Sequence, residues 1–299
     1  AILAPIPYWI SKKFNSKFIL EVRDLWPESI IEYRGLSRRN PIVLFMYKLE
    51  KCMYVKADKI VFTMEGGKDY IKEKGWEKDV DLSKIHHINN GVDLEEFYYN
   101  KENYQIADPD LDDENTFKVV YTGSIRLANN VKKIVDVAQS INKKGFNNIK
   151  FLIYGDGTDK EYLKQYCEKF KINNVIFKGF VEKHKIPYIL SKCDLNIMHF
   201  EQNSLKKYGA SLNKMFEYFA SGKPTISDCE FGYDIIKKYK CGIVIDNANA
   251  EQLAEEIIKL YNSSNEKYEF YCKNAIIAAK DYDYKNLVRK FEKVILELL

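Results

Sequence analysis

An amide, an ammonium and a carboxylate stand close together at Asn213, Lys214 and Glu217. Apolar side chains recur around them at helical spacing, which predicts a short helix with a buried face. Asn213 and Glu217 would lie one turn apart on another face of this helix, with Lys214 beside them. Charges that do not suit burial indicate a binding or catalytic site, and a core helix with a solvated ion pair is the alternative. The apolar positions are Leu212, Met215, Phe216, Phe219 and Ala220.

The residues after this helix are expected to end it. Gly222 can adopt the left-handed conformation that closes a helix, and Pro224 cannot continue one. Residues 225–227 then form a predicted strand. The polar helix therefore belongs to an alternation of helices and strands.

A second group of charges, at Arg23, Asp24 and Glu28, follows a stretch of β-forming residues at 17–22. Ligands gather beyond the carboxyl ends of the strands in open α/β sheets, so these charges stand where chemistry is usual. The alternative is a structural ion pair in which Arg23 binds Asp24 or Glu28 and fixes the loop.

The predicted strand at 117–121 runs into a turn that contains Gly123 and Ser124. A helix is expected to begin near residue 129 or 130. Glycine permits close approach of a ligand to the backbone, a helix N-terminus favours an anion, and Arg126 adds a positive charge. An ordinary turn between a strand and a helix is the alternative.

Two later predicted strands, at 151–154 and 175–178, also run into glycine. Gly155-Asp156-Gly157 is not a dinucleotide-binding fingerprint, because the third glycine is absent and no acidic residue closes the following strand in the expected way. A dehydrogenase is therefore disfavoured.

The composition is that of a globular protein, with 46% hydrophobic and 30% charged residues. The formal charge of +4 is small and its basic residues are interleaved with acidic ones, so nucleic acid is not expected as a partner. His86 and His87 would point to opposite faces of a strand, and the cysteines lack metal-binding or redox spacing. We therefore expect no metal, no cofactor, and reduced thiols in the cytoplasm.

Strands and helices alternate on both sides of one irregular segment, which predicts an α/β protein with two domains. Periodicity fails between residues 98 and 115, where Asp, Asn, Glu and Pro accumulate. We predict a first domain at 1–98, a linker at 99–116, a second domain at 117–282, and a helix at 283–299 that packs back toward the first domain. Residues 1–5 read as a domain interior, so we expect an N-terminal portion to be missing.

Taken in order, these motifs resemble those of retaining glycosyltransferases of family 4, whose GT-B fold has two facing Rossmann-like domains. The resemblance covers nearly the whole chain. The Glu-Val-Arg-Asp-Leu-Trp-Pro-Glu-Ser sequence at 21–29 is similar to one in bacterial polysaccharide, O-antigen and capsule transferases. The other motifs are Asn-Asn-Gly-Val-Asp at 89–93, Tyr-Thr-Gly-Ser at 121–124, Tyr-Gly-Asp-Gly at 154–157, Lys-Gly-Phe-Val at 178–181, and Asn-Lys-Met-Phe-Glu-Tyr at 213–218 with Gly-Lys-Pro at 222–224.

The resemblance implies transfer of a sugar, with retention, from a nucleotide-diphosphate sugar such as a UDP-sugar to a saccharide or lipid-linked acceptor. It implies that Glu217 binds the ribose hydroxyls, that Lys214 and Arg126 neutralise the diphosphate, and that Asp24 lies on the acceptor side. The backbone at Gly123 and Ser124 would approach the diphosphate, and Phe180 and Val181 would contact the base. The implied catalytic residues are Asp24, Arg126 and Lys214, and the implied substrate-binding residues are Gly123, Ser124, Gly155, Phe180, Val181, Asn213 and Glu217.

The chain departs from the family at several places. Gly209 stands eight positions before Glu217, where members often carry a second glutamate, and Arg23 stands where many have histidine. The Gly-rich loop and the N-terminal sheet with which the family begins are absent, so an incomplete N-terminal domain is expected. Two other functions stay open: a UDP-sugar epimerase of similar architecture, which needs no acceptor, and a binding-only partner that has lost catalysis.

The predicted helix at 42–56 is both basic and aromatic. Such a helix can lie on a membrane surface, which would suit a lipid-linked acceptor at the inner face of the cell membrane. Packing against the sheet is the favoured alternative.

Overall fold

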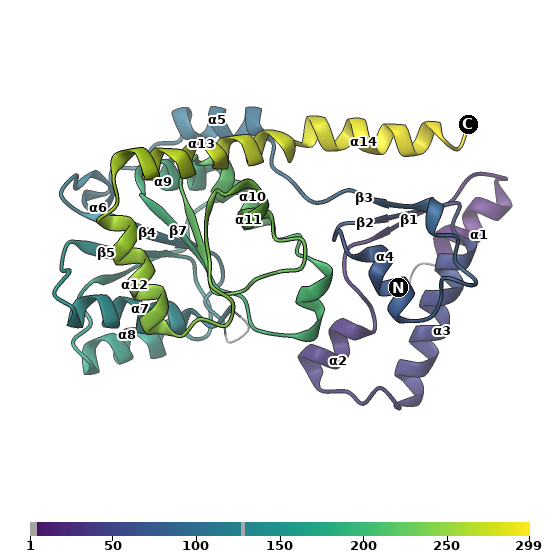
Figure 1. The fold of residues 1–299 in the computed structure, drawn as a ribbon, viewed down its shortest axis with the longest axis horizontal. Helices are drawn as coiled ribbons and strands as arrows, with labels where there is room; N and C mark the ends of the chain where they lie inside the picture. The colour runs from purple at the N-terminus through teal and green to yellow at the C-terminus, as the bar shows by residue number, and fades with distance from the viewer. Residues whose placement is uncertain (1–4, 127–128) are drawn as a thin grey trace.

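The computed structural model describes residues 5–126 and 129–299 and contains two parallel β-sheets surrounded by helices. In Figure 1 the sheets lie in separate halves of the molecule. The predicted α/β class, with two Rossmann-like units, is confirmed. Residues 1–4, on which the expectation of a missing N-terminal portion partly rested, lie outside the described residues.

The N-terminal half is built on a sheet with strand order β1-β2-β3. The central strand is apolar after its first residue, and Ile60, Val61 and Phe62 are each at most 3% exposed. The strands are β1 (Ile19–Val22), β2 (Lys59–Phe62) and β3 (Ile85–His87). Around them lie α1 (Pro5–Lys13), α2 (Glu28–Arg34), α3 (Pro41–Lys56), α4 (Gly67–Glu73) and the 3₁₀ turn η1 (Leu82–Lys84).

The C-terminal half is built on a sheet with strand order β6-β5-β4-β7-β8-β9. Both of its faces are buried, which is why its strands read as nearly continuous apolar runs. Along β4, for example, Val119 and Tyr121 enter one core cluster and Val120 enters the other. The strands are β4 (Phe117–Thr122), β5 (Ile149–Tyr154), β6 (Val175–Gly179), β7 (Leu195–Met198), β8 (Thr225–Ser227) and β9 (Gly242–Val244).

The helices of the C-terminal half include one that the sequence did not reveal, α13 (Asn265–Asp281). It packs on α10 and buries only alanines, Ala275, Ala278 and Ala279, so large apolar side chains do not mark its inner face. The other helices are α7 (Val131–Lys143), α8 (Lys160–Lys169), η3 (Lys183–Lys185), α9 (Ile186–Lys192), η4 (Ser204–Tyr208), α10 (Asn213–Ala220), α11 (Ile235–Tyr239) and α12 (Ala250–Tyr261).

The range predicted to be an irregular linker contains helical structure. α5 (Leu94–Asn103) extends into it and α6 (Pro109–Asp112) lies within it, and both pack against α9. Their caps explain the difference: Asp93 accepts a hydrogen bond from Glu96 N–H and Asp108 accepts one from Asp110 N–H. Asp and Pro are typical of loops, but they also begin helices. The domain boundaries themselves stay a prediction.

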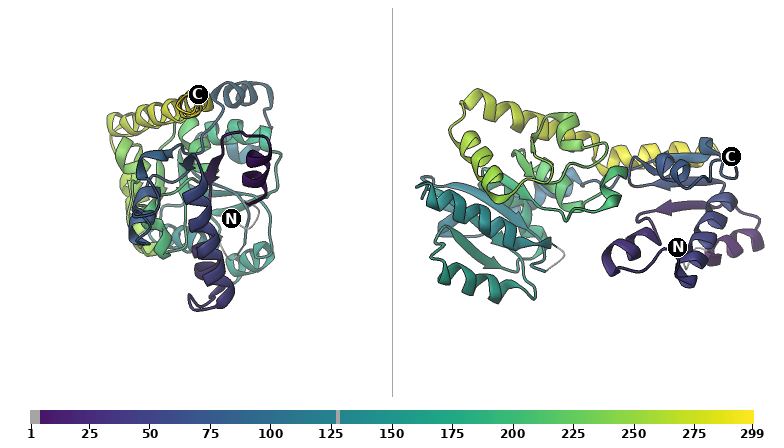
Figure 2. Two further views of the ribbon diagram at one scale, coloured as in Figure 1. Left: turned by 90° about the vertical axis from the view of Figure 1, so that its right-hand side faces the viewer. Right: turned by 60° about the horizontal axis from the view of Figure 1, so that its bottom comes forward.

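The last helix, α14 (Tyr284–Leu296), returns from the C-terminal half and runs alongside the N-terminal sheet, as the views in Figures 1 and 2 agree. Backbone bonds anchor its start, because Tyr284 N–H donates to the Val92 carbonyl at 3.0 Å. Just after its far end Glu297 forms an ion pair with Lys59, and Glu297 Oε2 lies 3.6 Å from His86 Nε2. The helix therefore ties the two halves together.

A second connection between the halves is made by η4. Tyr208 is 5% exposed and belongs to the N-terminal core cluster, where its ring meets Tyr70 at a centroid distance of 5.4 Å. Its hydroxyl lies 2.8 Å from Glu73, and its carbonyl accepts a bond from Gly66 N–H at 2.9 Å. Only glycine fits at position 66, because a Cβ there would lie 2.7 Å from the Tyr208 Cα.

Candidate functional site

A cavity of about 560 Å³ lies at the carboxyl ends of β4, β5 and β6, against the start of α10. We call it the strand-end cavity. All seven predicted substrate-binding residues line it, and so does Lys214. The complete lining is Thr122, Gly123, Ser124, Tyr154, Gly155, Asp156, Phe180, Val181, Lys183, Ile186, Leu212, Asn213, Lys214 and Glu217.

Two glycines let the strand-end loops meet backbone to backbone. Gly123 and Gly155 have φ angles of 148° and 147°, a region that side chains disfavour. A Cβ on Gly155 would lie 1.8 Å from the Gly123 carbonyl oxygen. Main-chain bonds from Gly123 N–H to Tyr154 at 3.0 Å and from Gly155 N–H to Gly179 at 2.7 Å join the loops. This part of the cavity wall is therefore backbone.

The opposite wall is α10, which buries Met215, Phe216 and Phe219 in the core as predicted. Gly222, just beyond its end, has a φ of 69° and closes the helix in the left-handed conformation. Asn213 at its start is exposed, while Lys214 and Glu217 are partly buried. Burial of the apolar face of α10 thus orients its polar residues toward the cavity.

Lys214 has an aromatic neighbour instead of a carboxylate. Its Nζ lies 4.6 Å from the centroid of the Tyr121 ring and donates to the Tyr121 hydroxyl at 3.4 Å. Within the described residues, no carboxylate lies at ion-pair distance from it. Burial lowers the pKa of the Lys214 ammonium to about 8, although nearby Glu217 raises it. The ammonium is available to an anion that enters the cavity.

Glu217 lies between two cavities. Asn213, Lys183 and Glu217 line both the strand-end cavity and a neighbouring cavity of about 350 Å³. The Glu217 side chain is 23% exposed, and its Oε1 lies 4.0 Å from Lys183 Nζ. Burial raises the pKa of Glu217, whereas Lys183 and Lys214 lower it. A carboxylate held in this way can accept hydrogen bonds from ligand hydroxyls.

We expect the affinity of the strand-end cavity for a nucleoside diphosphate to fall as the pH rises above about 8, the pKa of Lys214 in the free protein. A bound diphosphate favours the ammonium, so Lys214 must take up a proton when a ligand binds at higher pH. The affinity should then fall by up to about tenfold per pH unit, and below pH 8 this dependence should vanish. Titration calorimetry with UDP in buffers of different ionisation enthalpy measures both the affinity and the proton uptake. In Lys214→Met both effects should disappear; their persistence would show that another group titrates.

Two of the three predicted catalytic residues lie outside the strand-end cavity. Arg126 is exposed and does not line it. Asp24 lines two other cavities, of about 340 and 200 Å³. The smaller one is bounded by both halves of the molecule and shares Leu212 with the strand-end cavity. The roles of Arg126 and Asp24 stay predictions.

The charges after β1 differ from the sequence interpretation. Arg23 pairs with Glu21, at 3.9 Å, and not with Asp24 or Glu28. Glu28 is buried and binds Tyr47, Arg38 and Lys74. Burial raises the pKa of Glu28, but these partners outweigh burial and the pKa is lowered. Glu28 is therefore held by residues that lie 10 to 46 positions away in the sequence, which the sequence interpretation did not recognise. A role of Glu28 in chemistry stays a prediction.

Lys183 is a site residue that the sequence analysis missed. It stands at the start of η3, lines both cavities and faces Glu217 across 4.0 Å. Its position two residues after the Lys-Gly-Phe-Val motif was the only available signal. Phe180, in that motif, exposes 74% of its surface at the cavity. Such an aromatic ring is free to contact a planar ligand.

Residues 5–126 and 129–299 contain no cluster of three or more His, Cys, Asp or Glu side chains suited to a metal ion. The expectation that the protein needs no metal and no cofactor stays a prediction.

Two parallel α/β sheets in separate halves, with a cavity at the strand ends of the second, define a protein of the GT-B class. The chain belongs to the family described as glycosyl transferases group 1, whose model matches residues 105–278. The predicted membership of a glycosyltransferase family is thereby confirmed at this level.

Similar proteins agree with this membership. An uncharacterized glycosyltransferase of Methanocaldococcus jannaschii is 24% identical over 87% of this chain and 64% of its own length. A putative teichuronic acid biosynthesis glycosyltransferase of Bacillus subtilis is 26% identical over 70% of this chain and 49% of its own. This chain thus spans less than two thirds of either relative.

Solved structures share the fold at low identity. The Anabaena protein HepE in complex with UDP and glucose aligns with a TM-score of 0.71 and 15% identity, over 98% of this chain and 74% of that one. WaaG, a glycosyltransferase involved in lipopolysaccharide biosynthesis, aligns with a TM-score of 0.64 and 13% identity, over 96% of this chain and 80% of that one.

Proposed function

We propose that the strand-end cavity holds the donor of a retaining glycosyltransferase, a UDP-sugar, and that the sugar passes to a saccharide or lipid-linked acceptor in cell-surface polysaccharide synthesis. The observation that carries the proposal is the pair on α10. A lysine that has no carboxylate partner among the described residues and a partly buried glutamate face one cavity that has backbone on its other wall. A nucleoside diphosphate offers an anion to the first and ribose hydroxyls to the second.

The lining suggests how the donor lies. The diphosphate would approach Gly123 and Ser124, which line the strand-end cavity together with Lys214. The base would reach Phe180 and Val181, and the ribose would reach Glu217. Asn213, which also lines the cavity, would lie near the ribose.

Loss of the diphosphate is the chemical step that the site must assist. As the bond to the sugar breaks, negative charge grows on the phosphate and the sugar becomes cation-like. A fixed ammonium at Lys214 stabilises that growing charge, and Arg126 would add to it if its exposed side chain turned toward the cavity. The acceptor would enter from the side of Asp24, through the cavity of about 200 Å³ that borders Leu212. No metal is required in this proposal.

The proposal is tested by incubating the protein with a panel of UDP- and GDP-sugars and lipid-linked acceptors, and by analysing the products with mass spectrometry. We expect a glycosylated acceptor with release of UDP, unchanged by a chelator, and NMR of the product should show the donor's anomeric configuration. Isomerised sugar without acceptor would support the epimerase. Nucleotide binding without release of nucleotide would support a binding-only partner and contradict the proposal.

Peripheral contact with a membrane is also part of the proposal. Within the described residues no helix has both the length and the apolar character needed to cross a bilayer. α3 buries Met46 and Tyr54 but exposes Ile42, Leu44 and Phe45, so one part of it packs on the sheet and another faces outward. Sedimentation with liposomes at low salt tests the contact, and its failure there would remove this part.

A further inference from the structure

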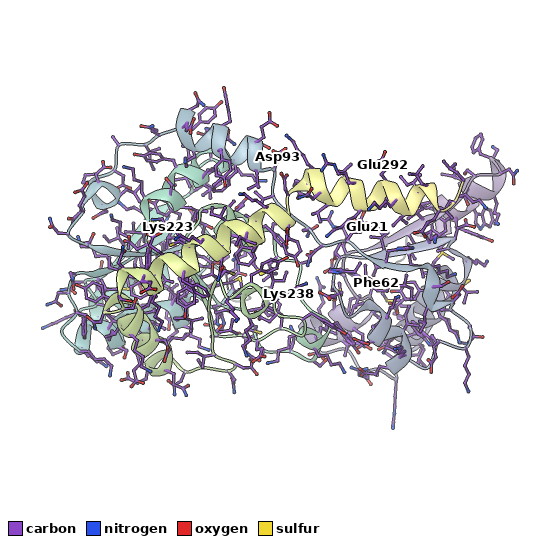
Figure 3. All side chains as sticks on the ribbon, turned by 45° about the horizontal axis from the view of Figure 1, so that its top comes forward. Glu21, Phe62, Asp93, Lys223, Lys238 and Glu292 are labelled. Atoms are coloured by element: carbon purple, nitrogen blue, oxygen red, sulfur yellow. The ribbon has the colours of Figure 1, made fainter. Side chains whose placement is uncertain are left out.

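A second polar cavity lies away from the strand-end cavity, at the junction of β3, α11 and α14. It has a volume of about 490 Å³, and we call it the hinge cavity. In Figure 3, Lys238 of α11 lies between the two halves, and it lines this cavity together with residues of α14. The lining residues are Glu65, His87, Asn89, Lys238, Tyr239, Asp281, Tyr282, Asn286, Leu287, Arg289, Lys290 and Lys293.

Four cations line the hinge cavity without a carboxylate partner. Lys238 comes from α11, whereas Arg289, Lys290 and Lys293 come from α14. No ion pair involves any of them in the part of the chain that the structure describes. Arg289 donates a hydrogen bond to the neutral side chain of Asn286 at 3.5 Å.

The two carboxylates of the hinge cavity already have other partners. Asp281 accepts a hydrogen bond from the Tyr239 hydroxyl at 2.7 Å, and Glu65 lies 4.0 Å from His87 Nδ1. Neither partner is a lysine or an arginine, so both carboxylates still count in the charge of the cavity. Four cations face two acids, and the lining therefore carries a net positive charge.

Cations from both helices lie close enough to His87 to lower its pKa. Burial lowers the pKa of His87, Glu65 raises it, and Lys290 and Lys238 lower it again. His87 on β3 thus senses positive charge from both α14 and α11. An anion at this point would be shared by elements of both halves of the molecule.

Hydrogen bonds connect the wall of the hinge cavity to the residues that immediately precede α10. Asn89 Nδ2 donates to the Ala210 carbonyl at 3.2 Å, and Asn90 N–H donates to Ser211 Oγ at 3.0 Å. Ser211 stands two residues before α10, which carries Lys214 and Glu217. The residues that precede α10 therefore connect the hinge cavity to the helix that lines the strand-end cavity.

We propose that the hinge cavity binds a phosphate-bearing ligand, separate from the donor, that bridges Lys238 of α11 and the basic face of α14. The chemistry fits a phosphate group, because lysine and arginine together supply charge and multiple N–H donors. The volume admits a ligand of sugar-phosphate size. The phosphate belongs either to a small soluble molecule or to a lipid head group. The inference does not depend on the proposed transfer reaction.

Pyrophosphate binding, measured by titration calorimetry, tests this site. All proteins carry Lys214→Met, so that the strand-end cavity contributes little. We expect the Lys214→Met protein to bind pyrophosphate with an affinity that falls as salt is added. Addition of Arg289→Gln and Lys290→Gln should weaken binding at least about tenfold, since two charge-assisted contacts are lost. Lys238→Gln, on the other helix, should also weaken it.

Charge-matched controls keep the result interpretable. Lys267 and Lys273 are exposed on α13 outside the hinge cavity, so Lys267→Gln with Lys273→Gln removes the same charge and should change little. Thermal melting checks that each variant is folded. Equal pyrophosphate affinity in the hinge-cavity variants and in the control, or no binding at all to the Lys214→Met protein, would overturn the proposal.

Vesicles identify the source of the phosphate. If phosphatidylglycerol vesicles sediment the Lys214→Met protein, and the Arg289→Gln/Lys290→Gln change abolishes this while phosphatidylcholine has no effect, the ligand is a lipid head group. If pyrophosphate binds but vesicle sedimentation is unaffected by the change, the site takes a soluble phosphate. Both results support the site, provided that the calorimetric loss is observed.

Discussion

Replacing Lys214 by methionine is expected to slow sugar transfer by about 10²–10³-fold, the usual cost of removing one group that stabilises charge in a transition state. Methionine keeps much of the length and packing of the lysine stem, so α10 should stay in place. Because negative charge on the diphosphate grows as the bond to the sugar breaks, the loss should be larger in kcat than in the affinity for UDP.

Steady-state kinetics with the active donor, combined with UDP titration, separate these two effects. Lys214→Arg restores the charge in a different shape and should recover part of the rate. Tyr121→Phe removes the hydroxyl that contacts Lys214 at 3.4 Å while keeping the ring beneath the ammonium, and should have a smaller effect. If Lys214→Met binds UDP much more weakly but turns over normally, the ammonium serves binding and not the chemical step.

Replacing Glu217 by glutamine is expected to weaken UDP binding by about 10–100-fold. Hydrogen bonds to a charged group contribute roughly 1.5–3 kcal/mol to stability or binding. The neutral amide of glutamine accepts weaker hydrogen bonds from the ribose hydroxyls than a carboxylate does. The pKa of Glu217 is raised by burial, so the wild-type protein should itself lose affinity as the pH falls and the carboxylate is protonated. The glutamine variant should lack this acid-side loss.

A double-mutant cycle identifies the ligand atoms that Glu217 contacts. UDP and 2′-deoxy-UDP are titrated into the wild type and Glu217→Gln. If the carboxylate accepts from the 2′-hydroxyl, removal of that hydroxyl should cost much less affinity in the variant than in the wild type. Additive losses would place Glu217 away from the 2′-hydroxyl. Lys183→Gln is a useful companion, because Lys183 faces the same carboxylate but is 90% exposed and should change affinity less.

Much of the strand-end cavity could be predicted from the sequence because its parts are set by local rules. The helical spacing of Met215, Phe216 and Phe219 fixes which side of α10 is buried, and hence which side presents Lys214 and Glu217. Strand-end glycines such as Gly155 were predicted because such turns need positive φ or close backbone approach. Parallel strands then bring these turns to one edge of the sheet.

Residues whose roles depend on distant contacts could not be predicted in this way. Glu28 is neutralised by Lys74, which is far along the chain, and Arg126 does not line the strand-end cavity. The helices α6 and α13 were missed because a proline at a helix start and a buried face of alanines give weak periodic signals. Local pattern fixes the orientation of a side chain on its own element, but only tertiary packing determines what it meets.

Tyr208 has a consequence for how this molecule should unfold. The N-terminal core includes an aromatic ring that the chain supplies only after it has built most of the second sheet, and the backbone of Tyr208 packs so closely on Gly66 that a Cβ there would clash. Separating the halves would leave a cavity in the N-terminal core and expose the Tyr208 ring to solvent. Loss of a buried aromatic side chain from a core costs about 3 kcal/mol or more of stability. The halves are therefore expected to melt in one cooperative transition, and a fragment cut between them to be less stable than its sequence length alone suggests.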